Sequence, residues 1–419
     1  MTLQALRGTT DLLPNDVERW TAVERAVRRI SRLYGYRELR TPIIEDAALF
    51  LRSIGETSDI VTKEMYTFQD RDGGSLSLRP EATASVVRAY MEHRLDQQPG
   101  LQKLYYIGPM FRRERPQKGR YRQFFQIGAE AIGSDSPAVD AEVIEMAMAL
   151  LAGLGLEGQR LLLNSVGCRH CRPRYVESLR RELESAAPAL CPDCQRRATT
   201  NPLRVLDCKV EADQAAIDRL PSILDHLCDG CRRHFEALRG HLDRRLNGSA
   251  PGYEVRPRLV RGLDYYERTT FEVVHGALGA QNSVLGGGRY DGLAELLGSK
   301  TPAPGIGFSI GEDRLVWTLE QAQPGVGAHR LDVYVAPLDE PSFERGVALV
   351  RDLRRAGRVV ELGSPGKLRR HLEIADKLAA RYTLMIGGAE VAENLYTLKH
   401  MATGEQKRLS PAELLELPS

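Results

Sequence analysis

The hydrophobic pattern has helical spacing near the N-terminus and changes farther along to the alternation typical of strands. From 16 to 31, apolar residues recur three or four positions apart, which predicts an amphipathic helix that ends before Gly35. The segment 38–44 is strand-like, and a helix is expected around 47–52. Helix, strand and helix therefore follow one another at the start of the chain.

Strand-like segments dominate the middle of the chain. They lie at 65–68, 75–78, 104–111, 123–132, 161–165, 253–257, 270–274, 283–285 and 307–310. The basic stretch between 104–111 and 123–132 contains Pro116 and Gly119, so we predict a hairpin with a long basic tip. Long strand runs of antiparallel type, with helices grouped between them, favour an α+β fold over strict alternation.

The pattern also divides the chain into domains. Between Cys168 and about Asn247 it changes to short helices, turns and cysteine pairs, which predicts a small, mostly helical domain at 168–247 inserted into a larger one at 1–325. A Gly- and Pro-rich stretch at 323–328 is read as a linker. A C-terminal α/β domain with mainly parallel strands is predicted at 329–419. Its strands are expected at 331–336, 358–362 and 382–386, and its helices at 341–356 and 368–380.

The composition suits a globular protein with more than one core. A chain of 419 residues forms two or three domains of ordinary size. It contains no uninterrupted apolar run of the roughly 20 residues that a membrane helix requires. The N-terminal segment lacks the basic start and apolar stretch of a secretory signal, so we expect a cytoplasmic protein without a membrane partner.

Charge is balanced overall but not locally. Lys and Arg number 58 against 56 Asp and Glu, so the net charge of +2 neither indicates nor excludes a polyanion partner. Two stretches are strongly basic, 112–122 and 351–370. Each is either a solvated face or a surface for a polyanion, and composition alone does not separate the two.

All seven cysteines fall between Cys168 and Cys231, and without an export signal they favour reduced thiols or metal ligation over disulfides. Six of them form three C-x-x-C pairs, and Cys208 stands alone. The pairs are Cys168 with Cys171, Cys191 with Cys194, and Cys228 with Cys231. Any two pairs supply four ligands for a tetrahedral zinc ion, but seven thiols exceed one such site and fall short of two. Structural zinc, free thiols and redox chemistry all remain open.

Four arginines lie beside glycine or aromatic residues at strand ends, turns or helix starts: Arg112, Arg120, Arg261 and Arg314. A guanidinium keeps its charge and offers paired donors, so such residues suit phosphate groups, although each alone could be a surface salt-bridge partner. The Walker pattern GxxxxGK[ST] is absent from the sequence. If ATP binds, it therefore binds outside the P-loop mode.

Two carboxylates and a glycine run are candidates for a second kind of site. Glu81 and Glu130 lie in apolar or strand contexts, and Gln126 shares a strand face with Glu130 because side chains alternate along a strand. Together they could bind a small polar ligand, or they could form a buried ion pair. The glycines at 286–288 permit close backbone approach, or they form a tight strand-to-helix turn.

The order of several motifs resembles one enzyme family over nearly the whole chain. Residues 7–14 (RGTTDLLP) look like its opening, and Thr41-Pro42 with the following helix looks like class motif 1, which is associated with dimerisation. The segments 111–114 (FRRE) and 307–314 (GFSIGEDR) look like motifs 2 and 3, and 259–266 (LVRGLDYY) and 287–292 (GGRYDG) look like signatures peculiar to the histidine enzyme. The chain thus resembles a bacterial-type histidyl-tRNA synthetase, a class II aminoacyl-tRNA synthetase.

The resemblance implies an enzyme that ligates histidine to tRNA(His) through a histidyl-adenylate, and it implies roles for the residues above. The implied histidine pocket consists of Glu81, Thr83, Gln126, Glu130, Tyr265, Tyr266 and Tyr290. The first three would receive the α-ammonium group, because a carboxylate and neutral acceptors satisfy its N–H donors. Glu130 and Tyr266 would engage the two imidazole nitrogens, and the remaining tyrosines would close the pocket.

The resemblance also implies sites for ATP and tRNA. Arg112 would hold the α-phosphate, Arg120 and Arg314 the outer phosphates with Mg²⁺, and Arg261 would stabilise the charge that develops when histidine's carboxylate attacks. The tRNA acceptor end would contact Arg115, Gln117 and Arg122.

The domains take their roles from the same resemblance. It makes 1–325 the catalytic domain and 329–419 an anticodon-binding domain, and it implies a homodimer. It does not imply zinc. The rival interpretation is a catalytically silent, histidine-sensing regulatory subunit of ATP phosphoribosyltransferase, which is expected to lack the C-terminal domain and to keep the active-site arginines poorly.

Overall fold

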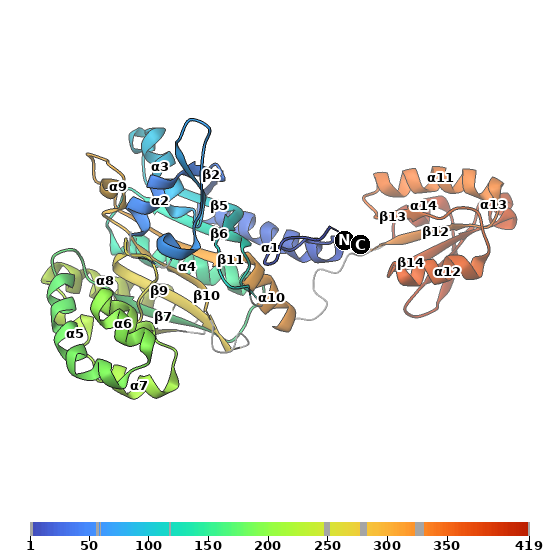
Figure 1. Ribbon diagram of the computed structural model, residues 1–419. Helices are drawn as coiled ribbons and strands as arrows, with labels where there is room; N and C mark the ends of the chain where they lie inside the picture. The colour runs from blue at the N-terminus through green and yellow to red at the C-terminus, as the bar shows by residue number, and fades with distance from the viewer. Residues whose placement is uncertain are drawn as a thin grey trace. The chain divides into compact units, whose positions relative to one another are not determined.

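The computed structural model describes residues 3–55, 58, 60–116, 119–246, 252–276, 283–322 and 331–417 (Figure 1). The chain divides into two compact units, 1–326 and 327–419. The predicted linker at 323–328 lies outside the described residues. The first unit is built on a large, mostly antiparallel sheet and the second on a smaller sheet, so the α+β class is confirmed.

The large sheet has eight strands in the order β1-β5-β6-β11-β10-β9-β7-β8. In that order the strands are β1 (Arg37–Glu38), β5 (Gln102–Phe111), β6 (Gln123–Ile132), β11 (Gly305–Gly311), β10 (Ser283–Arg289), β9 (Glu267–His275), β7 (Gln159–Ser165) and β8 (Tyr253–Val255). Only the outermost pairs, β1 with β5 and β7 with β8, are parallel. The predicted hairpin is confirmed as β5 and β6.

Four of the described helices cover one face of this sheet, and the candidate active site described below lies on the other face. The covering helices are α1 (Pro14–Leu33), α4 (Pro137–Gly153), α8 (Asp229–Arg245) and α10 (Glu312–Ala322). Trp20 and Val23 on α1 enter the main hydrophobic core with Ile127 and Ala129 on β6. Because side chains alternate along a strand, the even-numbered residues of β6 point to the opposite face.

A three-stranded sheet lies before the hairpin in the chain, and here one prediction is wrong. Its strands are β2 (Ile44–Asp46), β4 (Ser75–Leu78) and β3 (Tyr66–Gln69), in that order. The segment 38–44 is not one strand, because it is interrupted between β1 and β2 at Thr41 and Pro42. Proline donates no hydrogen bond, and the carbonyls of both residues accept from the guanidinium of Arg79 instead.

Shorter elements complete the first unit outside the insertion. They are α2 (Ala47–Ile54), a π-helical turn (Ile60–Glu64), α3 (Thr83–Glu92), a 3₁₀ turn (Leu95–Gln97) and α9 (Leu293–Leu296).

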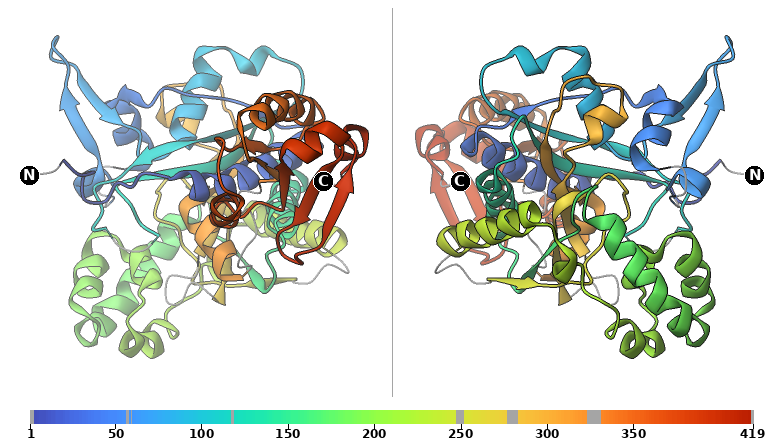
Figure 2. Two further views of the ribbon diagram at one scale, coloured as in Figure 1. Left: turned by 90° about the vertical axis from the view of Figure 1, so that its right-hand side faces the viewer. Right: turned by 90° about the vertical axis from the view of Figure 1, so that its left-hand side faces the viewer.

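The insertion runs from the end of β7 to β8 and is mostly helical, as predicted. It contains α5 (Arg172–Ala186), α6 (Pro192–Thr200), α7 (Glu211–Ile217) and α8, with 3₁₀ turns at Ala187–Ala189, Pro202–Asp207 and Ile223–His226. Its predicted end, Asn247, lies outside the described residues. Both views in Figure 2 show α5 to α7, in green, gathered in a lobe of their own. A separate core that includes Tyr175, Leu179 and the buried cysteines holds this lobe together.

The second unit has five strands in the order β13-β12-β14-β15-β16. The strands are β12 (Val333–Pro337), β13 (Val360–Leu362), β14 (Tyr382–Ile386), β15 (Tyr396–His400) and β16 (Gln406–Leu409); the helices are α11 (Glu340–Arg355), α12 (Leu368–Lys377), α13 (Gly388–Glu393) and α14 (Pro411–Leu415). The three predicted strands pair in parallel. The hairpin of β15 and β16, which was not predicted, pairs antiparallel beside them.

Among the described residues, none of the helices is both long and apolar enough to cross a membrane.

Candidate active site

A cleft of about 530 Å³ opens in the first unit on the sheet face away from α1. Nine of the residues singled out in the sequence line it: Glu81, Thr83, Arg112, Arg120, Gln126, Arg261, Tyr265, Tyr266 and Arg314. Glu130 and Tyr290 are not in its lining. They lie beneath it, 1% exposed in each case, and reach it through hydrogen bonds.

Glu130 is the centre of a buried polar cluster directly beneath the floor of the cleft. Thr83 donates its hydroxyl to Oε1 of Glu130 at 2.8 Å, and Tyr290 donates to Oε2 at 2.6 Å. Both donors come from elements far away in the sequence, the start of α3 and the end of β10. The carboxylate is therefore held in one orientation, and the same hydrogen bonds limit how many further donors it can accept.

The neighbouring strand has a glycine where it passes Glu130. Gly307 on β11 is paired with Glu130 on β6, and a Cβ built on Gly307 would lie 1.7 Å from the carboxylate. No side chain fits there without displacing Glu130. Gly307, the first glycine of GFSIGEDR, thus provides the space that the Glu130 carboxylate occupies.

Glu81 is fixed by the start of the following helix. Its two oxygens accept backbone N–H groups of Thr83 and Ala84 at 2.7 and 2.9 Å. Burial raises the pKa of Glu81 above its ordinary value, while these backbone hydrogen bonds oppose the rise. Each oxygen keeps a lone pair, so the carboxylate can still accept from a ligand's ammonium group. Gln126, whose Oε1 accepts from Tyr106 at 3.3 Å, lies in the same cleft.

Three tyrosines form an aromatic wall beside this floor. The rings of Tyr265 and Tyr266 are 4.8 Å apart and tilted, and that of Tyr290 meets Tyr265 edge-on at 6.1 Å. All three are at most 8% exposed. Burial is the main reason that the pKa of Tyr266 rises to about 12, so its hydroxyl stays protonated and can donate or accept.

The pKa of Glu130 predicts a pH effect. Burial raises it to about 8, against the hydrogen bonds from Tyr290 and Thr83, so the folded protein binds a proton that the unfolded chain releases above its ordinary value of 4.5. The stability contributed by this group is therefore full below pH 4.5 and is lost as pH rises through 8. Glu130→Gln has no group that titrates at this position, so the variant does not lose this stability. As pH rises from 4.5 to 8, the melting temperature of the variant should therefore increase relative to that of the unchanged protein.

The expected change in this comparison is at most about 1.4 kcal/mol per pH unit. Burial also raises the pKa of Glu312 to about 8. Because Glu312 is present in both proteins, its effect on the melting temperature cancels in this comparison. Melting curves at a series of pH values measure the effect. Parallel pH dependences of the two proteins would show that Glu130 is ionised throughout.

Arg261 lies over the glycine run of β10. A Cβ on Gly286 would lie 2.2 Å from its guanidinium, so the glycine makes room for this side chain. Glu272 on β9 faces the guanidinium at 3.3 Å. Burial alone would lower the pKa of Arg261, but Glu272, acting together with Tyr266, Asp207 and Tyr265, outweighs burial, and the pKa is raised. The glycines at 286–288 thus lie within a strand, and the alternative of a strand-to-helix turn is wrong.

The other three arginines point to the cleft from two directions. Arg112, at the end of β5, donates Nε to the carbonyl of Pro80 at 2.8 Å and lies 5.3 Å above the ring of Phe124. Arg120 pairs with Glu114 at 3.2 Å, and Arg314 on α10 donates to the carbonyl of Ser283 at 3.0 Å. Burial and the nearby Arg120 lower the pKa of Arg314, and Glu114 and Glu272 only partly offset this decrease.

The basic tip of the hairpin is at the edge of this site. Arg115 is exposed, and Arg122 is half-buried with its backbone N–H bonded to the carbonyl of Gly8 at 2.6 Å. Neither lines the cleft. Gln117 lies outside the described residues.

The insertion and one helix start contribute residues that sequence reasoning missed. Arg204 and Lys209 of the insertion line the cleft together with the predicted residues. Arg172, the first residue of α5, donates to the backbone carbonyls of Val166 and Tyr266. No local pattern indicates that Arg172 reaches Tyr266.

Comparisons with known proteins agree with this geometry. Residues 8–315 match the family model described as Histidyl-tRNA synthetase, and 332–417 match that of an Anticodon binding domain. A histidine–tRNA ligase of Solibacter usitatus is 65% identical over 98% of both chains. One of Koribacter versatilis is 54% identical over 98% of this chain and 95% of its own.

Two solved structures extend the comparison. The apo histidyl-tRNA synthetase of S. aureus is 36% identical, covers 99% of both chains and has a TM-score of 0.79. A Bacillus halodurans protein, described as an ATP phosphoribosyltransferase regulatory subunit/histidyl-tRNA synthetase, is 20% identical, covers 92% of this chain and 98% of its own, and has a TM-score of 0.64. At that identity the second likeness shows the fold alone.

Proposed function

This chain belongs to the histidyl-tRNA synthetase family, and from that membership we propose how its residues divide the work of the reaction. Its activity is that of a histidine–tRNA ligase: ATP activates histidine as histidyl-adenylate, and the histidyl group then passes to tRNA(His), releasing AMP and pyrophosphate. The regulatory alternative is not favoured, because the chain has the C-terminal domain that such a subunit was expected to lack.

The polar floor of the cleft binds histidine in this proposal. Glu81 and Thr83, with Gln126, receive the α-ammonium group. Glu130 and Tyr266 hold the two imidazole nitrogens, and Tyr265 and Tyr290 close the aromatic wall. A site that hydrogen-bonds both ring nitrogens leaves its own buried groups unpaired when an analogue lacks one, and this discriminates by orders of magnitude. The fixed orientation of the Glu130 carboxylate supports this assignment.

The arginines bind ATP beside it. Histidine's carboxylate oxygen attacks the α-phosphorus, the bond to the β-phosphate bridge breaks, and pyrophosphate leaves. Arg112 and Arg261 contact the α-phosphate and stabilise the charge that develops there, while Arg120 and Arg314 hold the outer phosphates. The family uses ATP with Mg²⁺, which enters with the substrate. Catalysis is then mainly positioning and electrostatic stabilisation, and no protein nucleophile is required.

The observation that carries this proposal is the juxtaposition, in one cleft, of a buried carboxylate and tyrosine cluster with four arginines. Amino-acid-dependent ATP–pyrophosphate exchange, run with each standard amino acid, tests it. Exchange with histidine alone is expected. Folded protein that binds histidine but exchanges with none of them would overturn the proposal.

The tRNA binds in two places in this proposal. The basic tip of the hairpin, with Arg115, Gln117 and Arg122, contacts the acceptor end. The anticodon-binding domain, 329–419, carries a second basic stretch, 351–370. Arg351, Arg354 and Arg355 lie on or at the end of α11, where phosphates of the anticodon stem can approach.

Arg115→Ala should separate the two steps of the reaction. The side chain is exposed and lies outside the cleft, so pyrophosphate exchange should stay within about twofold of normal. The KM for tRNA should rise by about 3- to 10-fold. The slope of log binding constant against log salt concentration should become shallower by about one, the contribution of one phosphate contact. Arg181→Ala on α5, another exposed arginine, is the matched control and should change neither. Equal loss of exchange and of charging would place Arg115 in the ATP site instead.

We also propose a cytoplasmic homodimer. Large apolar side chains around motif 1 are exposed in the single chain: Leu33 is 70% exposed, Ile43 42% and Ile44 49%. A second copy would cover them, and motif 1 is the element associated with dimerisation in this class. Sedimentation equilibrium at micromolar concentration should give twice the mass of the chain, and a monomer there would contradict the proposal.

A further inference from the structure

The seven cysteines of the insertion form two separate clusters, and together with one carboxylate they make eight potential ligands. The first cluster contains Cys168, Cys171, Cys228 and Cys231. The second contains Cys191, Cys194, Cys208 and Asp213. Within each cluster all ligand atoms lie within 4.8 Å of one another. The apparent mismatch in the sequence, seven thiols for one site or two, is resolved because Asp213 supplies the eighth ligand.

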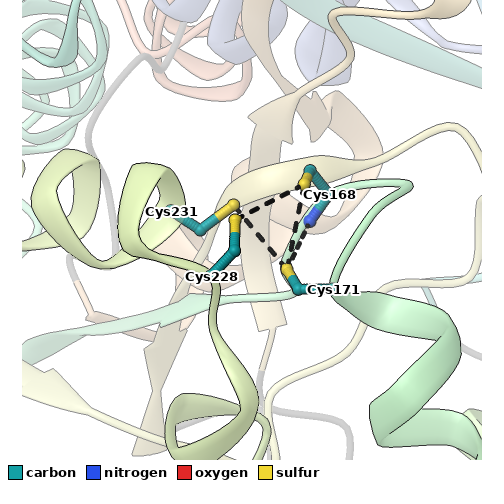
Figure 3. Close-up of side chains that lie close together, drawn as sticks. All are labelled: Cys168, Cys171, Cys228 and Cys231. Carbon is teal, nitrogen blue, oxygen red and sulfur yellow. Dashed lines mark hydrogen bonds between the residues drawn. The ribbon is translucent and has the colours of Figure 1, made fainter.

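In the first cluster the thiols converge from two segments 60 residues apart (Figure 3). The Sγ of Cys168 is 3.8 Å from that of Cys171 and 3.9 Å from that of Cys228, and Cys171 is 3.8 Å from Cys231. A disulfide would bring two sulfurs to about 2.0 Å. A tetrahedral ion with zinc–sulfur bonds of about 2.3 Å has edges of about 3.8 Å between its ligands. The observed spacing therefore fits four thiolates around zinc.

Backbone donors and burial complete this first site. The N–H of Cys168 donates to the Sγ of Cys171 at 3.3 Å, which is a hydrogen bond suited to a charged sulfur. Three of the four cysteines are at most 8% exposed, and Cys228 is half-buried. Without an ion, four thiols packed in this way would make only weak hydrogen bonds to one another. Four thiolates, in contrast, bind a divalent cation firmly.

The second cluster has an independent observation, a buried carboxylate. Asp213 is 3% exposed and, among the described residues, takes part in none of the ion pairs found. It accepts the backbone N–H of Cys191 on both oxygens at 3.1 Å, and its Oδ2 lies 3.2 Å from the Sγ of Cys208. Burying a carboxylate without a cation is costly. A cation among these side chains would account for its position.

We propose that the insertion binds two structural zinc ions, one in a Cys₄ site formed by Cys168, Cys171, Cys228 and Cys231, and one in a Cys₃Asp site formed by Cys191, Cys194, Cys208 and Asp213. Zinc suits both sets, because it prefers four ligands in a tetrahedron and accepts sulfur and carboxylate oxygen together. Both sites are closed by four protein ligands, which is the arrangement of structural rather than catalytic zinc.

Each site is close to a residue that reaches the cleft. Arg172 follows Cys171 directly, and its guanidinium holds the backbone carbonyl of Tyr266 in the histidine pocket. The Cys₄ site thus fixes the start of α5 from which Arg172 extends. In the second site, Cys208 lies between Asp207 and Lys209, which both line the cleft. Loss of either ion should therefore act on the active site as well as on the insertion.

Metal analysis of the full chain, purified from zinc-containing medium without chelator or metal-affinity tag, tests the proposal. Two zinc ions per chain are expected, one for each cluster. Replacement of zinc by Co²⁺ should give the intense visible absorption of tetrahedral cobalt with thiolate ligands. Zinc well below one ion per chain, with all seven thiols of the native protein reactive, would overturn both sites. Iron in place of zinc would overturn the assignment of the metal.

Variants separate the two sites. Cys168→Ser with Cys228→Ser should remove one zinc ion, and Asp213→Ala should remove the other. Asp213→Cys should restore the second ion, because a thiolate replaces the carboxylate. The matched control is Glu211→Gln, an exposed carboxylate two positions away on the same helix, which should retain both ions. If Asp213→Ala retains both ions, the second site is wrong.

If these variants fail to fold, a thiol titration of the unchanged protein tests the same proposal. A mercurial that consumes the thiols should release zinc in proportion, and a coloured chelator should report two ions once all seven thiols have reacted. Thiol modification without zinc release would overturn the proposal.

Discussion

Arg261→Ala is expected to lower the kcat of histidine-dependent ATP–pyrophosphate exchange by about 10²- to 10³-fold, the cost of removing one preorganised donor from a developing charge. The guanidinium is already in place over Gly286, and its Nε is buried without a partner among the described residues. Glu272 keeps it charged and oriented at 3.3 Å. Little reorganisation is needed when a phosphate arrives, so most of the loss should appear in kcat rather than in KM.

Two further variants make this result interpretable. Arg256→Ala, at the end of β8 and outside the cleft, should keep normal exchange. Arg261→Lys keeps the charge but loses the paired donors, so it should recover only part of the activity. The melting temperature of Arg261→Ala should stay close to normal. A rise in the KM for ATP with unchanged kcat would show that Arg261 binds the ground state only.

Asp140→Ala is expected to produce the largest loss of stability, about 3 kcal/mol. Asp140 on α4 and Arg289 on β10 are both 0% exposed, and the guanidinium reaches the carboxylate through Nε at 3.1 Å and Nη2 at 2.5 Å. Thr269 also donates to this carboxylate, at 2.6 Å. Removing one partner of a buried ion pair leaves the other charge in a low-dielectric interior, which costs about 3–5 kcal/mol. Asp291 still pairs with Arg289, so the lower value is expected.

Thermal unfolding measures this effect. In a unit of this size the melting temperature should fall by roughly 4 to 5 °C. Glu177→Ala breaks an exposed pair on α5, with Arg181, and should shift it by no more than about 1 °C. A small shift in Asp140→Ala would mean that water or His234, which lies 3.5 Å from the carboxylate, compensates the guanidinium.

The parts of the fold that the sequence predicted well are those set by local pattern. The β5 and β6 strands were predicted almost to the residue, since alternation is long there and Pro116 and Gly119 mark the loop. The prediction of one strand over 38–44 was wrong because it could not take account of Arg79. This residue is distant in the sequence, and its guanidinium donates to the carbonyls of Thr41 and Pro42. The β15 and β16 hairpin has short strands of mixed polarity and gave no clear signal.

The site shows the same division. Motif order indicated most of the residues that line the cleft, but not the depth at which they lie: Glu130 and Tyr290 are under the floor rather than on it. Contacts made through backbone atoms, such as that of Arg172 with the carbonyl of Tyr266, leave no trace in residue type. Asp213 was missed for a related reason. A carboxylate five residues beyond a lone cysteine follows no familiar ligand spacing, and only the fold of α7 brings it to Cys208.

The glycines that border the cleft have a consequence for inhibitor resistance. A compound that fills the proposed histidine pocket would lie against strands whose backbone is already covered by the enzyme's own side chains. A new side chain at Gly307 or Gly286 would collide with Glu130 or Arg261 before it reached the compound, and one at Gly288 would collide with Tyr266. Narrowing the pocket from these positions would disable the enzyme, so escape mutations should arise elsewhere.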